Sequence, residues 1–164
     1  MRFGKDIKYA ILAFLIGTFE VAFGKYIAIF GAVPMLTFSF CTVCAIRESE
    51  ESYVLVLSAL LGGLSDILFG HGFGTYTLAF SLSAYYTFKL KDAIFSSKWL
   101  FLLLDAFFMT LFVQLFYMIL HMGDIGTANF SGGILHVILP TCFYNTAICS
   151  LFYYISERFS RKRR

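Results

Sequence analysis

Long runs of apolar residues, separated by short polar segments, fill almost the whole chain. They do not alternate apolar and polar positions in segments of about ten residues, as strands of a membrane barrel do, so they predict helices. A membrane-crossing helix needs about 20 mainly apolar residues, and 164 residues leave room for about six of them with short loops. We expect these six helices at residues 9–23, 26–46, 53–70, 75–88, 99–120 and 133–156.

Composition agrees with this pattern. Hydrophobic residues make up 59% of the chain and charged residues 14%, and the mean hydropathy is +0.78. A soluble domain carries about 25% charged residues, so we expect an all-α integral membrane protein. Residues 1–164 are predicted to form one polytopic membrane domain that ends in a basic tail at 157–164, which excludes a large soluble enzyme domain.

The basic residues predict an orientation. If both termini are cytoplasmic, every Lys and Arg except Lys25 falls on the cytoplasmic side of the six predicted helices. Cytoplasmic loops are enriched in these residues, so six crossings with both ends inside is the expected topology. The basic tail at 157–164 is expected to rest on anionic lipid headgroups.

One stretch combines glycines with an acid inside a predicted helix. Gly62, Asp66, Gly70 and Gly74 are four residues apart, so those that are helical share one face. A carboxylate at the centre of a membrane helix costs about 2.5–3.5 kcal/mol, and small residues allow helix backbones to approach closely. Two interpretations remain open. The face packs on the next helix with Asp66 hydrogen-bonded inside, or it shapes a partner-binding site or polar cavity.

Further polar residues fall near the outer ends of the predicted helices. Glu20, Asp66 and His136 lie at similar depth, with Lys25 nearby. One hypothesis is that they form an ionic cluster, because pairing offsets part of the cost of removing charges from water.

The last predicted helix carries His136, Pro140 and Tyr144 at four-residue spacing, with Asn145 beside them. Pro140 lacks a backbone donor, so a kink is expected there. The alternative for His136 is an ordinary buried histidine.

The helix predicted at 99–120 has polar residues on two sides. Thr110, Gln114 and Tyr117 form a polar stripe, whereas Asp105 lies opposite Gln114 and is expected to make a separate contact.

Motifs for catalysis and cofactor binding are missing from the sequence. It contains no phosphate-binding Gly-x-x-x-x-Gly-Lys-Ser/Thr loop, no His-Glu-x-x-His and no Gly-x-Ser-x-Gly. The histidines and acids lack metal-ligand spacing. Cys41 and Cys44 fall in the middle of a predicted helix, and they, Cys142 and Cys149 are expected to be buried and inert. We therefore expect no catalytic, metal-binding or cofactor-binding site.

Taken together, these motifs resemble the bacterial rod shape-determining MreD family. That family carries Gly-x-x-x-Asp-x-x-x-Gly-x-x-x-Gly with Leu four residues on, and here Leu78 follows Gly62, Asp66, Gly70 and Gly74 in register. Pro140, Tyr144 and Asn145 match the proline and the Tyr-Asn-like element of its last helix. Met35 departs from the family, which often has Asp or Asn between the corresponding Pro and Leu.

The resemblance implies a non-catalytic subunit of the cell-elongation complex in the bacterial cytoplasmic membrane. Such a subunit binds MreC and helps couple MreB filaments to peptidoglycan synthesis by RodA and a class B penicillin-binding protein. The implied fold is similar to the six-helix substrate-binding subunit of energy-coupling-factor transporters. Neither a cofactor nor nucleic acid is among the implied partners. The glycine–aspartate residues, with Glu20, His136, Pro140, Tyr144 and Asn145, are the candidates for partner binding or bundle packing.

An alternative function shares the same fold. The chain would be the solute-binding membrane subunit of an energy-coupling-factor vitamin transporter, and Glu20, Asp66 and His136 would line its ligand pocket. The two functions differ in their consequences: loss of Asp66 would change cell shape in the first and solute uptake in the second.

Overall fold

The computed structural model describes residues 3–29, 32–69, 74–91, 97–120 and 137–161. Within these ranges the chain forms six α-helices and no strand, apart from an isolated bridge between Ile29 and Ala32. The helices are α1 (Phe3–Phe23), α2 (Leu36–Arg47), α3 (Glu51–Phe69), α4 (Thr75–Leu90), α5 (Lys98–Leu120) and α8 (Leu139–Arg161). The expected all-helical architecture is confirmed for this part of the chain. The likeness to the transporter subunit fold stays a prediction.

The second helix is much shorter than expected. The sequence predicted a helix from residue 26 to 46, but α2 begins only at Leu36. A turn follows α1, and the chain from Ala32 to Met35 is not helical. Pro34 has no backbone donor and disfavours helical geometry in the residue before it, which explains why a regular helix does not run through Val33 and Pro34.

The last helix also differs from its expected bounds. α8 extends to Arg161, so most of the predicted basic tail continues the helix. Its expected start at residue 133 lies outside the described residues. Pro140 is the second residue of α8, and a short π-helical segment at residues 137–138 directly precedes the helix. The expected kink at this proline stays a prediction.

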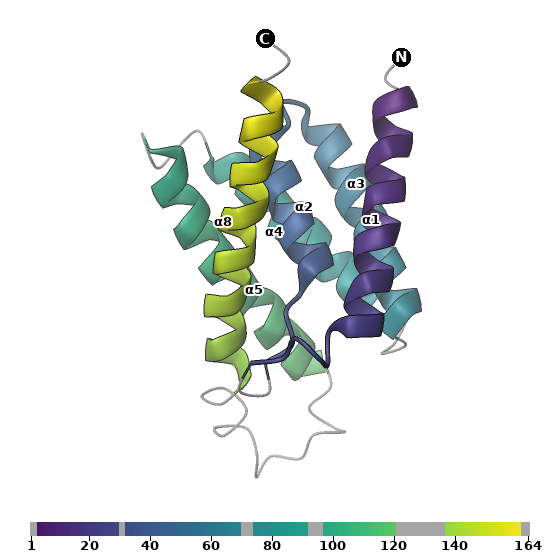
Figure 1. Ribbon diagram of the computed structural model, residues 1–164, viewed down its shortest axis with the longest axis vertical. Coiled ribbons are helices and arrows are strands. Elements are labelled where there is room, and N and C mark those ends of the chain that lie inside the picture. The colour runs from purple at the N-terminus through teal and green to yellow at the C-terminus, as the bar shows by residue number, and fades with distance from the viewer. Residues whose placement is uncertain (1–2, 30–31, 70–73, 92–96, 121–136, 162–164) are drawn as a thin grey trace.

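α2 is the centre of the bundle. It contacts each of the other five described helices, and its residues from Thr37 to Ala45 are all buried. A helix at the centre of a bundle is buried on all sides, and α2 fits that description from Thr37 to Ala45. Figure 1 shows α1 and α8 on either side of α2, and α1 packs on α2 and α3 whereas α8 packs on α2 and α5.

Charged residues gather at the end of the bundle where α1 begins and α8 ends (Figure 1). Arg47 donates to Ser156 Oγ at 2.5 Å, and Lys89 forms a 2.6 Å salt bridge with Glu51 that raises the pKa of Lys89. Lys91 donates to the carbonyl of Glu48, just beyond the C-terminus of α2. A cation at this position stabilises the negative end of the helix dipole.

Two of the described helices, α3 and α5, are long and apolar enough to cross a membrane. The apolar part of α1 (Ile11–Phe23) and the whole of α2 are shorter.

Candidate functional site

Asp66 holds the beginning of α4. It lies near the end of α3 and is 4% exposed. Its Oδ1 accepts from Tyr76 N at 2.8 Å, and its Oδ2 accepts from Gly74 N at 2.9 Å, Thr77 N at 3.1 Å and Thr77 Oγ1 at 2.6 Å. The first backbone N–H groups of a helix lack partners within it, and a carboxylate also stabilises the positive end of its dipole. Asp66 therefore caps α4 from a neighbouring helix.

Two glycines of the motif make this cap possible. Gly74 has φ +100°, a conformation that side chains other than glycine rarely adopt, and this geometry presents its N–H to Asp66. Gly62 lies against the first turn of α4: a Cβ there would be 2.5 Å from Thr77 Cα and 2.6 Å from the Tyr76 carbonyl oxygen. The missing side chain lets the two backbones meet. Gly70 lies outside the described residues.

Glu20 does for α2 what Asp66 does for α4. It is 5% exposed, and its Oε2 accepts from Thr37 N and from Thr37 Oγ1, both at 2.8 Å. Thr37 is in the first turn of α2. The carboxylate of α1 thus caps the helix that follows it in the chain.

Glu20 and Asp66 therefore share one arrangement. In each case an acid on one helix binds both the backbone N–H and the hydroxyl of a threonine in the first turn of the next helix. Neither partner, Thr37 or Thr77, was predicted from the sequence. Threonine near a helix start is a recognised capping signal, but its acceptor here comes from another helix, and local spacing does not reveal that.

Tyr144 and Asn145 hold the non-helical chain that precedes α2. Tyr144 donates its hydroxyl to the carbonyl of Ile27 at 2.9 Å, and Asn145 Oδ1 accepts from Met35 N at 2.9 Å. Both contacts cross more than 100 residues of sequence. A backbone polar group that is buried without a partner is costly, and these side chains supply partners where the helix is absent.

The proposed outer ionic cluster divides into separate contacts in the described part of the chain. Glu20 and Asp66 cap different helices, and Lys25 is exposed. His136 lies outside the described residues. Asp105 makes its own contact, as expected, and accepts from Thr87 Oγ1 of α4 at 2.9 Å.

No group of three or more His, Cys, Asp or Glu is placed to hold a metal ion within the described ranges. The four cysteines are buried and form no disulfide.

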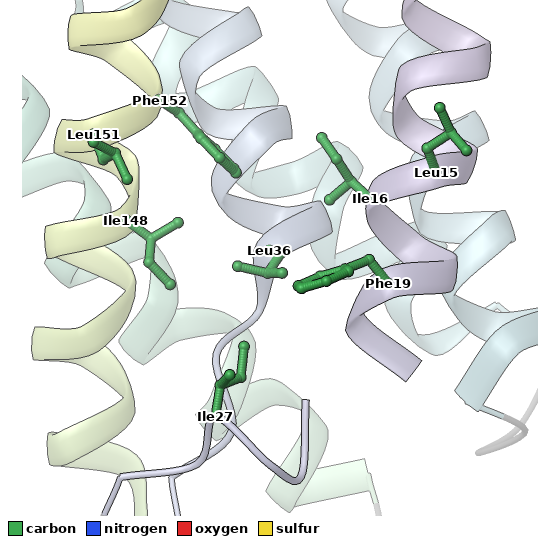
Figure 2. A pocket seen from close by; sticks show the side chains of 8 residues that line it. All are labelled: Leu15, Ile16, Phe19, Ile27, Leu36, Ile148, Leu151 and Phe152. Atoms are coloured by element: carbon green, nitrogen blue, oxygen red, sulfur yellow. The ribbon is translucent and has the colours of Figure 1, made fainter. Parts of the chain in front are cut away.

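An apolar groove opens between α1 and α8. Its volume is about 410 Å³, and almost all of its lining is apolar. Figure 2 shows side chains of α8 and α1 on its two sides, with Leu36 of α2 at its floor and Ile27 at one end. The residues that line it are Leu15, Ile16, Phe19, Ile27, Leu36, Ile148, Leu151 and Phe152. None of the candidate residues from the sequence lines this groove.

Removing the Glu20 carboxylate should loosen α2. We expect Glu20→Ala to destabilise the protein by about 2–4 kcal/mol, because the Thr37 N–H and hydroxyl would lose their acceptor in a buried site. Thermal unfolding of the purified protein in detergent measures this effect. Glu51→Ala, which removes only the exposed salt bridge to Lys89, is the control and should cost less than about 1 kcal/mol. Equal losses in the two variants would contradict a capping role.

Among the described residues, six packed helices, two of them able to cross a membrane, with carboxylates capping internal helix ends, define a helical-bundle protein. Comparison with family models gives a match to the rod shape-determining protein MreD over residues 1–163. The chain belongs to the MreD family, whose members are membrane proteins of rod-shape determination. Searches of curated proteins and of solved structures find no match.

Proposed function

We propose that the protein is a non-catalytic membrane subunit of the bacterial cell-elongation complex. It binds MreC and helps couple MreB filaments to peptidoglycan synthesis by RodA and a class B penicillin-binding protein. Membership of the MreD family supports the role in rod shape, and the apolar groove between α1 and α8 supports the binding of a partner helix.

Asp66 and Glu20 bind groups inside the bundle, so we expect the partner to bind elsewhere. Asp66 accepts four hydrogen bonds from the start of α4, and Glu20 accepts two from α2. The groove, in contrast, offers apolar side chains on two helices that rise beside a recessed third. Helices associate in lipid by close van der Waals packing, and a recess between two helices receives the side-chain ridge of another. We therefore place the membrane span of MreC in this groove.

The proposed topology is six crossings with both termini in the cytoplasm. α1 begins and α8 ends at the same end of the bundle, which carries Arg47, Lys89 and Lys91 (Figure 1). Lys25 follows the other end of α1. This distribution supports a cytoplasmic location for the charged end.

The second crossing is helical over only part of its length. The 12 residues of α2 extend about 18 Å, and the four non-helical residues before it add up to about 13 Å, which together match a hydrocarbon core of about 30 Å. Irregular backbone at membrane depth is tolerated where protein buries it and supplies its hydrogen bonds. Asn145 accepts from Met35 N, and Ala32 pairs with Ile29 through both backbone groups.

Photocrosslinking tests the partner and its surface together. We expect p-benzoylphenylalanine placed at Leu15 or Leu151, on the two sides of the groove, to crosslink to MreC in cells. The control position is Ile67 of α3, which is apolar and 70% exposed but lies outside the groove. Crosslinks at Ile67 and none at the groove would place the partner elsewhere.

A bulky residue in the groove gives a second measurement of the same proposal. Ile148→Trp should reduce copurification of MreC by at least tenfold, because the side chain fills space that the partner needs. Ile119→Trp on α5, where the native residue is 60% exposed, should leave copurification unchanged. Unchanged capture by Ile148→Trp would contradict docking at this site.

The transporter alternative requires carboxylates that face a ligand. The carboxylates of Glu20 and Asp66 are instead directed at threonines and backbone N–H groups, and the groove is apolar. Ile148→Trp distinguishes the two functions. Altered cell shape with normal vitamin uptake supports the elongation-complex subunit, and normal cell shape with lost vitamin uptake supports the transporter.

A further inference from the structure

Buried polar atoms without a hydrogen-bond partner in the described part of the chain include Ser39 Oγ on α2, Ser83 Oγ on α4 and Asn145 Nδ2 on α8. Each of these residues is at most 2% exposed. Buried polar groups are nearly always hydrogen-bonded, so each of the three calls for a partner.

Ser39 and Asn145 lie on facing sides of α2 and α8. Met35 N donates to Asn145, and four residues further along both helices Cys149 Sγ lies 3.7 Å from the carbonyl oxygen of Ser39. The two contacts are therefore one turn apart on the same pair of faces. This register places the Ser39 hydroxyl within about one turn of the Asn145 amide.

Ser83 reaches the same level from α4. Thr87, one turn further along α4, donates to Asp105 of α5. α4 and α5 pack together and run in opposite directions, so the residue of α5 opposite Ser83 is about one turn beyond Asp105, near Thr110.

Ser39 also faces Thr110. Gln114 of α5 donates to Met35 Sδ at 3.3 Å, and one turn away, Ser39 on α2 comes opposite Thr110 on α5. Thr110 is fully buried, and its hydroxyl donates to the carbonyl of Ala106, which leaves it free to accept. Ser39, Ser83 and Thr110 thus lie near one level at the junction of α2, α4 and α5, and Asn145 of α8 lies within about one turn of them, beside Met35.

We propose that Ser39, Ser83, Thr110 and Asn145 form an internal water-binding site in the centre of the bundle. The name polar layer is used below for these four residues. The polar layer lies about one turn beyond the start of α2, where the irregular chain becomes helical.

The chemistry of the layer selects water over an ion. Asn145 Oδ1 already accepts from Met35 N, so its unpaired Nδ2 is a donor and requires a ligand that accepts. A metal cation cannot accept a hydrogen bond, and none of the four side chains carries a positive charge to balance a buried anion. Water accepts from the amide and also donates to the serine oxygens. Buried waters typically make about three hydrogen bonds to such groups.

A double-mutant cycle tests whether the two serines share a ligand. We expect Ser39→Ala and Ser83→Ala each to lower the Tm of the protein in detergent. The double variant should lose clearly less than the sum, because the shared water is lost only once. The control Ser81→Ala removes a hydroxyl that donates to the carbonyl of Thr77 within α4, and its effect should add to that of Ser39→Ala. Serine variants that leave Tm unchanged or raise it, with additive effects, would overturn the proposal, since truly unpaired hydroxyls are removed without loss.

Pulsed X-ray radiolysis tests for the water itself, because radicals formed from bound water oxidise the side chains beside it. Met35 donates its N–H to Asn145 and is 9% exposed, whereas Met118 is 7% exposed and packs with Ile138 and Cys142, nearer the start of α8. We expect oxidation of Met35 to exceed that of Met118 severalfold, and to fall in the Ser39→Ala, Ser83→Ala double variant. Equal oxidation of the two methionines would overturn the proposal. A higher Tm in sodium than in choline, with no such difference in the double variant, would instead identify the ligand as a cation.

Discussion

Asp66→Ala is expected to destabilise the bundle more than any other single change to the described polar residues. The substitution leaves three backbone N–H groups and one hydroxyl at the start of α4 without their acceptor. An orphaned buried donor costs about 1–3 kcal/mol, so a loss of at least about 3 kcal/mol is expected. Thermal unfolding in detergent, followed by size-exclusion chromatography of the heated sample, measures it.

Two further variants separate capping from partner binding. Asp66→Asn keeps one acceptor oxygen but turns an NH₂ group towards donors, so it should fall between the wild type and Asp66→Ala. Glu51→Gln changes an exposed acid and should shift stability by less than about 1 kcal/mol. If Asp66→Ala abolished MreC capture while leaving Tm unchanged, Asp66 would contact the partner and the capping account would be wrong.

Gly62→Ala is expected to force α3 and α4 apart. The new Cβ would lie 2.5 Å from Thr77 Cα and 2.8 Å from Thr77 N, and backbone atoms cannot yield as the end of a flexible side chain can. Overpacking of this kind typically costs about 1–3 kcal/mol. The displacement would also lengthen the hydrogen bonds from Thr77 to Asp66, so the effect should reach the upper end of that range. Chemical denaturation in mixed micelles measures the loss.

Gly63→Ala is the matched control, one residue away on the same helix. A Cβ there meets only Thr77 Oγ1 at 3.6 Å, an ordinary van der Waals contact. Alanine is a better helix former than glycine by about 1 kcal/mol, so Gly63→Ala should be neutral or stabilising. Similar losses at the two positions would mean that the close approach of the helices does not decide the role of Gly62.

The two interpretations of the glycine–aspartate motif place the partner-binding surface differently. If the motif packs helices, the partner binds elsewhere; if the motif binds the partner, it is itself that surface. In the described residues the motif joins α3 to α4: Gly62 allows the contact, Asp66 caps the next helix and Gly74 supplies the turn. We therefore propose that the motif serves the fold, and that partner recognition belongs to the apolar groove of α1, α2 and α8. Asp66 variants would then change cell shape through loss of folded protein, and Ile148→Trp would change it at normal abundance.

The sequence was a better guide to residues than to their partners. Asp66, Glu20, Tyr144 and Asn145 were all singled out as polar groups within apolar runs, and each makes a buried or partly buried hydrogen bond in the structure. Their partners were not predicted because Glu20 and Thr37 are separated by a non-helical segment, and Asn145 and Met35 are 110 residues apart in the sequence. The groove escaped for another reason: isoleucine and leucine look the same to sequence analysis whether they face lipid, a core or a partner.

By itself the sequence predicted a membrane protein of six helices, since long apolar runs have few other stable forms. The described residues contain six helices. It also located the acids, because a charge among apolar residues stands out in any register. Only the tertiary structure decided where the second helix begins and which helix ends the acids cap. The physical reason is that helix formation follows local periodicity, whereas the pairing of a buried carboxylate depends on which backbone N–H groups are brought to it by packing.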